Sequence, residues 1–357
     1  MNAKQLTKRQ IFNVFQKKYA KFSPEVELLI KAEQVERLNQ LVVDKNAVIL
    51  KHNYMTWDLQ CDEVKGFRGD SLELSRKAAE TTAEIILFLG VKFMAETAKV
   101  LNPNKTVLIP SLRAGCSLAS SITGADVRKL KAMYPGNPVV AYVNTDADTK
   151  SEVDVCCTSS NAAIVVKWAA HKWKTDNVIF LPDEFMARNV AKEIGAEIIF
   201  PTLAANNKNM QKPTSGMVII GWPGRCEVHE KFTTTDVTNL RTEFPEVYIM
   251  AHPECSPDVI KKVDYSGSTS AMIKEVQRPE VQKRQIAFFT ECAMVEMLAA
   301  QHKNVLQVCS IQKRCPYMAT NNLESAINAL EHMEYAISIP EEIRKRAEIP
   351  IRRMISI

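Results

Sequence analysis

The sequence predicts an α/β protein of three homologous domains, each a three-layer α/β/α domain with a parallel sheet, related by a pseudo-threefold axis. Two observations predict this fold. Short apolar runs alternate with helical patterns along most of the chain, which is typical of parallel βαβ units. The same order of strands and helices then occurs three times. Because the loops at the carboxyl ends of parallel strands build binding sites, we expect the active site at the central junction of the domains.

The elements of each domain are expected in the same order of strand, helix, strand, helix, strand. In the first domain, residues 46–136, they fall at 47–50, 71–82, 84–89, 91–101 and 106–110. In the second, 137–245, they fall at 138–145, 160–173, 177–182, 184–194 and 217–221, with a polar insertion at 204–216. In the third, 246–321, they fall at 246–254, 269–277, 286–290, 292–300 and 304–308. We expect an N-terminal helical segment over 1–45 and a C-terminal helical tail over 322–357.

The composition excludes several classes of protein. With 46% hydrophobic and 24% charged residues, the chain of 357 residues is that of a folded globular protein. A net charge of +5 is too small to indicate nucleic-acid binding, and no apolar run approaches the roughly 18 residues of a membrane span. No secretory signal precedes the nine dispersed cysteines, so we expect a cytoplasmic protein without a disulfide scaffold.

Equivalent residues recur at matching intervals, which supports the triplication. The tips of the three first strands carry His52, Asn144 and His252, separated by 92 and 108 residues. Near the start of the second helix of each domain, Met94, Met186 and Met294 repeat these two intervals. Two independent sets of residues therefore show the same two intervals. We expect each domain to contribute one copy of every tip to the central site.

A cysteine follows the last strand of each domain, and these three cysteines are candidate metal ligands: Cys116, Cys226 and Cys315. Three thiolates from symmetry-related loops leave one coordination position free, which suits an iron-sulfur cluster or zinc. The other cysteines are expected to be inert thiols: Cys61, Cys156, Cys157, Cys255, Cys292 and Cys309. The role of His229, three residues after Cys226, stays open between a partner of the metal centre and a packing residue.

Serine and threonine stand at the start of the first helix of each domain: Ser71, Ser159, Ser160, Ser268 and Thr269. Helix capping alone explains such residues. A helix N-terminus is also a site for phosphate or carboxylate, so three of them facing one pocket would suit a substrate with several anionic groups. Both interpretations hold together.

The tips of the first strands supply groups for proton transfer. Because alternate residues of an extended segment share a face, His52 lies with Tyr54, Tyr142 with Asn144, and His252 with Glu254. Histidine titrates near neutral pH, glutamate is a general base, and tyrosine donates to a developing oxyanion. We expect this set to form the acid-base machinery.

The motifs "HNY", "GDSLELSR", "YVNT", "TSSNA", "LPDEF", "WPGRCEVH", "HPEC", "GSTS", "TEC" and "CPYM", in this order, closely resemble those of the quinolinate synthase family, NadA. The resemblance covers about residues 45–325. It implies three α/β domains and a 4Fe-4S cluster on Cys116, Cys226 and Cys315 with an open iron site that acts as a Lewis acid. It also implies the condensation of iminoaspartate with dihydroxyacetone phosphate to quinolinate, phosphate and water in de novo NAD synthesis, with iminoaspartate supplied by an L-aspartate oxidase or dehydrogenase.

The resemblance assigns roles to the polar tips. It implies catalysis by His52, Tyr54, His252 and Glu254. It implies substrate binding by His52, Ser71, Tyr142, Asn144, Ser159, His252, Glu254, Ser268 and Thr269. One departure is that Cys309 precedes Cys315 by six positions, whereas many members have C-x-x-C spacing there. Two alternatives stay open, a zinc enzyme that uses the same cysteines and a cluster protein without catalysis that senses redox state or iron.

Overall fold

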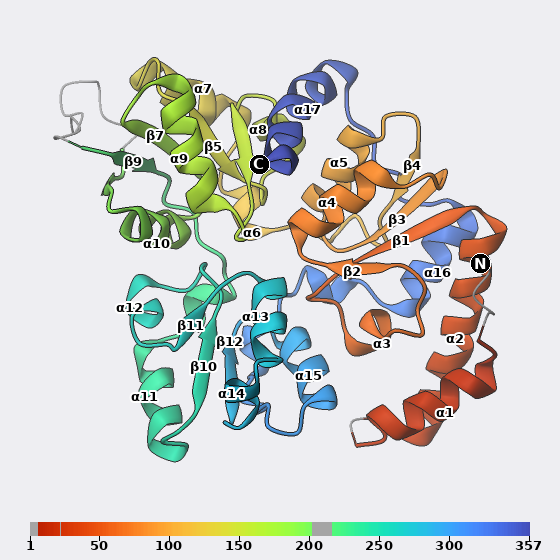
Figure 1. Ribbon diagram of the computed structural model, residues 1–357. Helices are drawn as coiled ribbons and strands as arrows, with labels where there is room; N and C mark the ends of the chain where they lie inside the picture. Colours follow the sequence, from red (N-terminus) through yellow and green to blue (C-terminus); the bar gives the residue numbers. More distant parts are fainter. Residues whose placement is uncertain (1–5, 22, 202–215) are drawn as a thin grey trace. The chain divides into compact units, whose positions relative to one another are not determined.

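The computed structural model describes residues 6–21, 23–201 and 216–357, so the insertion predicted at 204–216 lies outside the described residues except for Gly216. The protein is an α/β protein with three parallel sheets, as predicted (Figure 1). The chain divides into two compact units. The first unit comprises residues up to Ala114 and Glu291–Ile337, and the second comprises Gly115–Thr290 and Ser338–Ile357. The predicted domain boundaries stay predictions.

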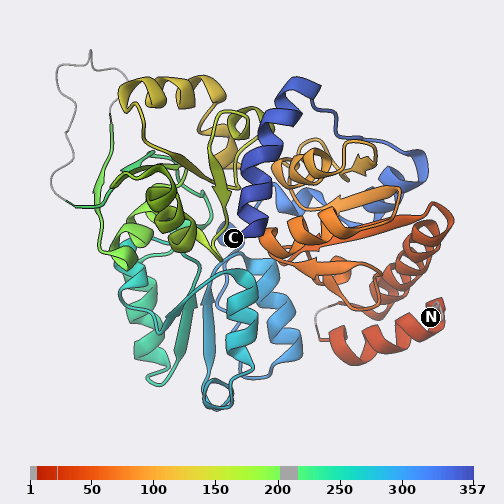
Figure 2. The same cartoon turned by 45° about the horizontal axis from the view of Figure 1, so that its top comes forward.

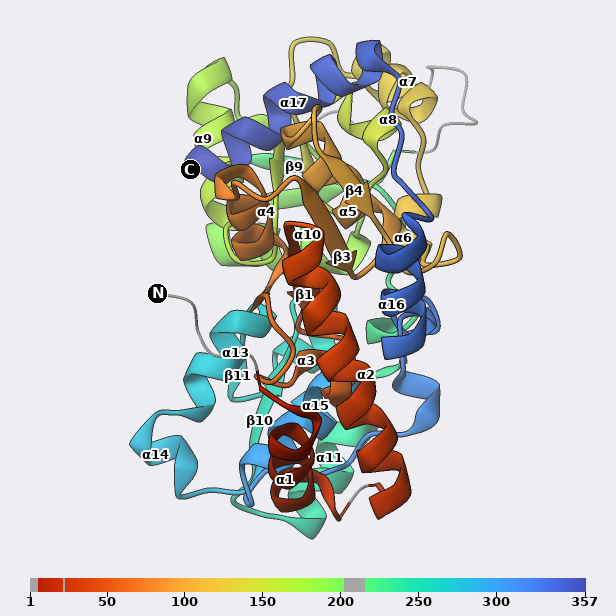
Figure 3. The ribbon, with the colours of Figure 1, turned by 90° about the vertical axis from the view of Figure 1, so that its right-hand side faces the viewer.

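The first unit contains one sheet and the helices around it. Its first part comprises α1 (Lys8–Tyr19), α2 (Glu25–Asp44), β1 (Ala47–His52), α3 (Trp57–Gln60), β2 (Phe67–Gly69), α4 (Ser71–Glu80), β3 (Ile85–Leu89), α5 (Lys92–Leu101) and β4 (Thr106–Leu108). Its second part comprises α15 (Cys292–Gln301), two 3-10 helices, η2 (Ile311–Lys313) and η3 (Met318–Thr320), and α16 (Leu323–His332). The strand order is β2-β1-β3-β4, and α2 and α16 lie side by side (Figure 3).

The second unit contains two sheets. The first sheet and its helices comprise α6 (Ser117–Ser120), α7 (Gly124–Met133), β5 (Val139–Tyr142), α8 (Ala147–Lys150), β6 (Val155–Cys157), α9 (Ala162–Trp173), β7 (Asn177–Leu181), α10 (Glu184–Ile194), β8 (Glu197–Ile199) and β9 (Val218–Gly221). The second comprises η1 (His229–Lys231), α11 (Thr234–Glu243), β10 (Tyr248–Ala251), α12 (Pro257–Ile260), β11 (Tyr265–Ser266), α13 (Thr269–Val276), α14 (Pro279–Gln282) and β12 (Ile286–Phe289). The final helix, α17 (Glu341–Ser356), packs against α8 and β6 and ends at the C-terminus marked in Figure 2.

The three sheets share one strand order. In each, the first strand lies between a short strand that follows it in the chain and the strand that precedes the second helix: β2-β1-β3, β6-β5-β7 and β11-β10-β12. All these pairs are parallel. The triplication of strands and helices predicted from the spacing is therefore present in the topology. It places the tips of β1, β5 and β10 at equivalent positions of their own sheets.

The structure corrects two sequence predictions. Residues 304–308 form no strand, because only Val305 of this segment is buried and the polar Asn304 and Gln307 interrupt the apolar run. Cys292 and Cys309 are not inert thiols but form a disulfide, with Cα atoms 5.6 Å apart across a sequence separation of 17 residues. In the part of the chain that the structure describes, no helix is long and apolar enough to cross a membrane.

A buried lysine holds the loop that follows β5. Lys150 is fully buried, and its Nζ donates to the carbonyl of Val143 at 2.8 Å and to that of Thr145. Tyr142 ends β5 and Asn144 lies in this loop, so the ammonium group fixes the main chain next to two candidate site residues. A buried carbonyl left without a donor costs about 1–3 kcal/mol.

Lys150→Met is therefore expected to lower the free energy of unfolding by about 2 kcal/mol, because the carbonyls of Thr145 and Val143 lose the ammonium donor and that of Val143 keeps the N–H of Thr145. Urea denaturation measures the difference, and Lys129→Met, which removes an exposed lysine of α7, is the control. Equal stability of the two variants would show that Lys150 does not hold the loop.

Candidate functional site

Glu254 is the centre of a buried polar cluster in the second unit. Strand β10 ends at Ala251, and the next turn carries Glu254, of which only 3% is exposed. Its Oε1 accepts a hydrogen bond from the hydroxyl of Tyr142 at 2.6 Å and one from Nδ2 of Asn144 at 3.3 Å. The structure thus brings together the predicted tips of β5 and β10. Oδ1 of Asn144 is buried and accepts no hydrogen bond from the described residues, so a ligand is free to donate to it.

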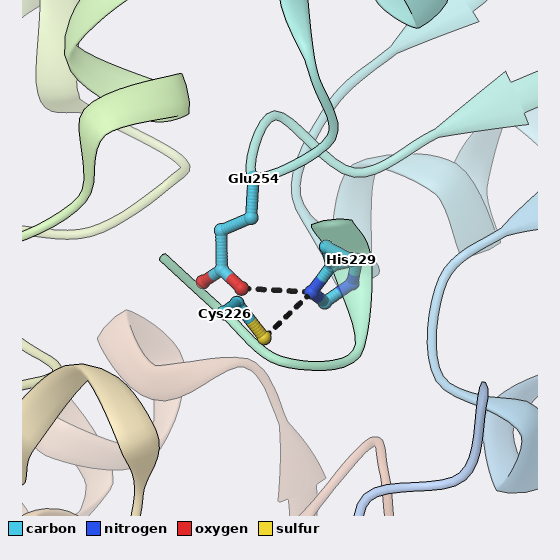
Figure 4. Close-up of side chains that lie close together, drawn as sticks. All are labelled: Cys226, His229 and Glu254. Atoms are coloured by element: carbon cyan, nitrogen blue, oxygen red, sulfur yellow. Dashed lines mark hydrogen bonds and ion pairs between the residues drawn. The ribbon is translucent and has the colours of Figure 1, made fainter. Parts of the chain in front are cut away.

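His229 links the cysteine loop to Glu254. Its Nδ1 lies 2.8 Å from Oε2 of Glu254 and 3.2 Å from Sγ of Cys226 (Figure 4). Its Nε2 lies 3.1 Å from Oγ1 of Thr290, the residue that follows β12. With both ring nitrogens engaged and 2% of the residue exposed, His229 is a partner of the candidate centre and not a surface residue.

Opposite effects act on the ionisation of Glu254. Burial disfavours the carboxylate, but the charges of His229 and His252, with hydrogen bonds from His229 and Tyr142, prevail and hold the pKa of Glu254 well below its ordinary value. The carboxylate is therefore ionised at neutral pH. Burial and then the charge of Glu254 raise the pKa of nearby Asp183 well above its usual range, which disfavours the ionised form of this second buried carboxyl group.

The two predicted histidine tips have the same local geometry. In the first unit, the main-chain N–H of Tyr54 donates to Nδ1 of His52 at 3.2 Å. In the second unit, the N–H of Glu254 donates to Nδ1 of His252 at 3.4 Å. Each ring is thereby held over the residue two positions later, and each histidine is 4% exposed. The ring of His252 also lies 4.8 Å from that of His229, between ring centroids.

Exposure separates the three candidate ligand cysteines from the other free thiols. Cys116, Cys226 and Cys315 are partly exposed, whereas Cys61, Cys156, Cys157 and Cys255 are buried. Within the second unit, Cys116 lies close enough to Cys226 for its charge to raise the pKa of that thiol, after the larger effects of burial and of Glu254. Ligand atoms of Cys226, His229 and Glu254 lie within 4.8 Å of one another. These donors fit a metal centre.

A pocket of about 580 Å³ in the second unit is lined by the starts of two helices. The lining includes Ser159, which lies before α9, and Ser268, the N-cap residue of α13. It also includes Pro253, the residue between His252 and Glu254. Helix N-termini favour anionic groups. Ser268 caps its helix by accepting from the N–H of Ala271, but Ser159 caps none, so capping does not explain it.

The remaining predicted site residues stand at other helix starts. Ser71 is the first residue of α4, which Asp70 caps, and it belongs to the first unit with His52, Tyr54 and Cys315. In the second unit, Thr269 is buried at the first position of α13, and the exposed Ser160 lines the pocket.

Sequence reasoning missed two residues of the cluster, Thr290 and Asp183. Both belong to quoted motifs, "TEC" and "LPDEF", near a helix start: Asp183 is the N-cap residue of α10, and Thr290 directly precedes Glu291, the N-cap residue of α15. That position was the only available signal, because neither residue has a counterpart of the same type in the other repeats.

A parallel α/β fold with a charged histidine-carboxylate cluster, partly exposed thiols and an anion-suited pocket is that of an enzyme. The family model described as "Quinolinate synthetase A protein" matches residues 34–356. The chain is 44% identical over 332 residues to the quinolinate synthase of Caulobacter vibrioides, which is 93% of this chain and 84% of that protein. It is 43% identical over 339 residues to the quinolinate synthase of Sinorhizobium medicae, covering 94% and 86% of the two chains. It is 42% identical over 337 residues to quinolinate synthase 2 of Mesorhizobium japonicum, covering 94% of each.

The chain belongs to the quinolinate synthase family. The family resemblance, the enzyme class and the function in NAD biosynthesis that the motifs predicted are confirmed.

Glu254→Gln is expected to lower the free energy of unfolding of the metal-free protein by about 2 kcal/mol at pH 7, because an amide offers one acceptor oxygen where the partners of Glu254 use both oxygens of the carboxylate. The pKa of Glu254 is lowered from the ordinary value of 4.5, so its stabilisation is complete above that pH and is lost as the pH falls below it. The difference between the two proteins should therefore shrink in acid.

Urea denaturation from pH 3 to pH 7 measures this difference. Glu230→Gln, which removes an exposed carboxylate beside His229, is the control. A difference between wild type and Glu254→Gln that is constant over the pH range would contradict the role of the charge.

Proposed function

We propose that the chain condenses iminoaspartate with dihydroxyacetone phosphate to give quinolinate, phosphate and water, with a 4Fe-4S cluster held by Cys116, Cys226 and Cys315. The observation that carries this proposal is that these three cysteines, selected by their repeat positions, are also the partly exposed free thiols of the described residues. Soft thiolates are the ligands that iron-sulfur clusters require. When bound, such a cluster supplies a Lewis acid through an iron without a cysteine ligand.

The polar residues of the second unit have distinct proposed tasks. The starts of α9 and α13, with Ser159, Ser268 and Thr269, bind the anionic groups of the substrates. The ionised Glu254 orients Tyr142 and Asn144 by accepting their hydrogen bonds, and it pairs with Nδ1 of His229. Because its pKa is held low, Glu254 keeps a proton less readily than its neighbours do, so we assign proton carriage to His252 and the Tyr142 hydroxyl.

The first unit supplies a second acid-base pair in this proposal. His52 accepts the main-chain N–H of Tyr54, as His252 accepts that of Glu254, so both pairs present an imidazole and an ionisable side chain in the same relation. We assign proton transfer during isomerisation and ring closure to Tyr54, and substrate binding to His52 and Ser71. An L-aspartate oxidase or dehydrogenase is the proposed source of iminoaspartate. We place the reaction in the cytoplasm, where thiolate ligands stay reduced.

A second candidate function is a zinc enzyme, which the cluster of Cys226, His229 and Glu254 favours because zinc binds thiolate, imidazole and carboxylate. Against it, Nδ1 of His229 and both oxygens of Glu254 already take part in contacts with each other and with Tyr142. Zinc ligation would have to break these contacts, whereas ligation by the three cysteines leaves them in place.

Removal of each candidate ligand separates the two functions. After purification without oxygen, Cys116→Ala, Cys226→Ala and Cys315→Ala are each expected to lose most of the iron and acid-labile sulfide of the wild type and all quinolinate formation, with unchanged circular dichroism. Cys255→Ala, the matched control next to Glu254, should keep both iron and sulfide, because Cys255 is buried, donates to the carbonyl of Phe289 and is not one of the three candidate ligands. Zinc without sulfide in the wild type would contradict the cluster.

The pocket is tested by Ser159→Ala, because Ser159 lines it without capping a helix. The loss of one hydrogen bond to a charged group predicts a roughly tenfold higher KM for at least one of the two substrates. Ser270→Ala, on α13 but outside the pocket lining, is the control. Unchanged KM values for both substrates in Ser159→Ala would remove Ser159 from the binding site.

A further inference from the structure

In each repeat, the start of one helix (α5, α10 or α15) is joined by a hydrogen bond to the segment that carries the candidate ligand cysteine. At the start of α5, the N–H of Lys92 donates to the carbonyl of Ala114 at 2.7 Å. At the start of α10, the N–H of Glu184 donates to the carbonyl of Gly224 at 2.7 Å. Each carbonyl lies two residues before the cysteine. In the first two repeats, a main-chain hydrogen bond therefore ties the cysteine loop to a helix start.

The third repeat uses a side chain instead. Glu291 is the N-cap residue of α15 and is 1% exposed. Its Oε2 accepts from the N–H of Ala293 at 2.6 Å, and its Oε1 accepts from the N–H of Cys315 itself at 3.1 Å. One buried carboxylate thus joins the first turn of the helix to the main chain of the candidate ligand.

We propose that Glu291 is a positioning residue that fixes the main chain of Cys315 for metal ligation. This inference rests on the proposed function, because it takes Cys315 as a ligand. Each oxygen of the buried Glu291 side chain accepts from one main-chain N–H, and metal ligands are held in place by hydrogen bonds from the residues around them. The disulfide between Cys292 and Cys309 fixes the same segment six residues before Cys315. The hydrogen bond to Glu291, in contrast, is made by the main chain of Cys315 itself.

The second repeat shows what a shorter side chain does at this position. Asp183, the N-cap residue of α10, accepts from the N–H of Met186 at 2.7 Å through Oδ1. Its Oδ2 is buried and has no hydrogen-bond partner among the described residues, and the cysteine loop is held by the main chain instead. An aspartate therefore caps the helix at this position without reaching the loop.

Glu291→Asp is the sharpest variant, because aspartate is among the best capping residues but is one methylene shorter. Glu296→Gln is the matched control: it changes a carboxylate of the same helix that pairs with Arg314, the neighbour of Cys315, and leaves the contact with the Cys315 N–H intact. The holoenzymes are purified without oxygen and exposed to an iron chelator, and the loss of the iron-sulfur absorbance is followed. The electron paramagnetic resonance spectrum of the reduced cluster and the melting temperature are recorded beside it.

We expect Glu291→Asp to lose its absorbance about tenfold faster than the wild type and to show a changed resonance spectrum, with Glu296→Gln within twofold of the wild type. A folded Glu291→Asp isolated without iron supports the same conclusion. If Glu291→Asp does not fold, Glu291→Gln is used, which keeps the length of the side chain but offers only one acceptor for two N–H groups.

A lower melting temperature with wild-type absorbance loss and spectrum would overturn the inference, since Glu291 would then only cap α15. So would equal effects of Glu291→Asp and Glu296→Gln. Cys315→Ala separates this failure from failure of the proposed function. If Cys315→Ala keeps its iron and sulfide, the ligand set is wrong. If it loses them while Glu291→Asp does not, only the role of Glu291 is wrong.

Discussion

The candidate site of the second unit depends on the burial of one charged carboxylate. Glu254 has lost almost all its water, which alone would protonate it, and it stays ionised because two histidines and a tyrosine hydroxyl replace the solvent. Removing any of these groups weakens the interactions of the carboxylate with the others. The turn after β10 supplies the carboxylate, while the end of β5 and the cysteine loop supply side chains that contact its two oxygens.

The repeat explains how such a cluster arises from ordinary parallel sheets. In each repeat the first strand lies inside the sheet, and the chain leaves its carboxyl end in a tight turn that places two side chains on one face. The same turn holds His52 with Tyr54 and His252 with Glu254 by the same main-chain hydrogen bond. The main-chain hydrogen bond of this turn is the same in the two repeats, whereas the ionisable side chain that the turn carries differs, Tyr54 in one and Glu254 in the other.

The repeated topology and the three candidate ligand cysteines could be predicted from the sequence, because both depend on a pattern that recurs along the chain. The two intervals that separate His52, Asn144 and His252 recur between the methionines of the second helices, and this match predicted the repeated topology. The same logic selected three cysteines that share partial exposure. Short strands such as β2 and β11 were missed, because two or three residues have no periodicity to detect. The disulfide between Cys292 and Cys309 was missed because pairing depends on distance in space, which widely separated positions do not reveal. His229 could be placed next to Cys226 from the sequence, but its contact with Glu254 arises from a separate strand.

Four buried polar oxygens without a hydrogen-bond partner among the described residues belong to residues in or near this cluster. Oδ1 of Asn144, Oδ2 of Asp183, Oδ1 of Asn189 and Oε1 of Glu227 accept no hydrogen bond from the described residues. Asn144 contacts Glu254, Asn189 lines the pocket and donates to the carbonyl of Pro253, and Glu227 adjoins Cys226. Each such atom disfavours the ligand-free fold, because burial has removed its water without replacing it. A ligand that donates to some of these atoms recovers part of that free energy on binding, so the cost lies in the unliganded protein and the gain in the complex. Ligand binding should therefore stabilise the second unit relative to its ligand-free form.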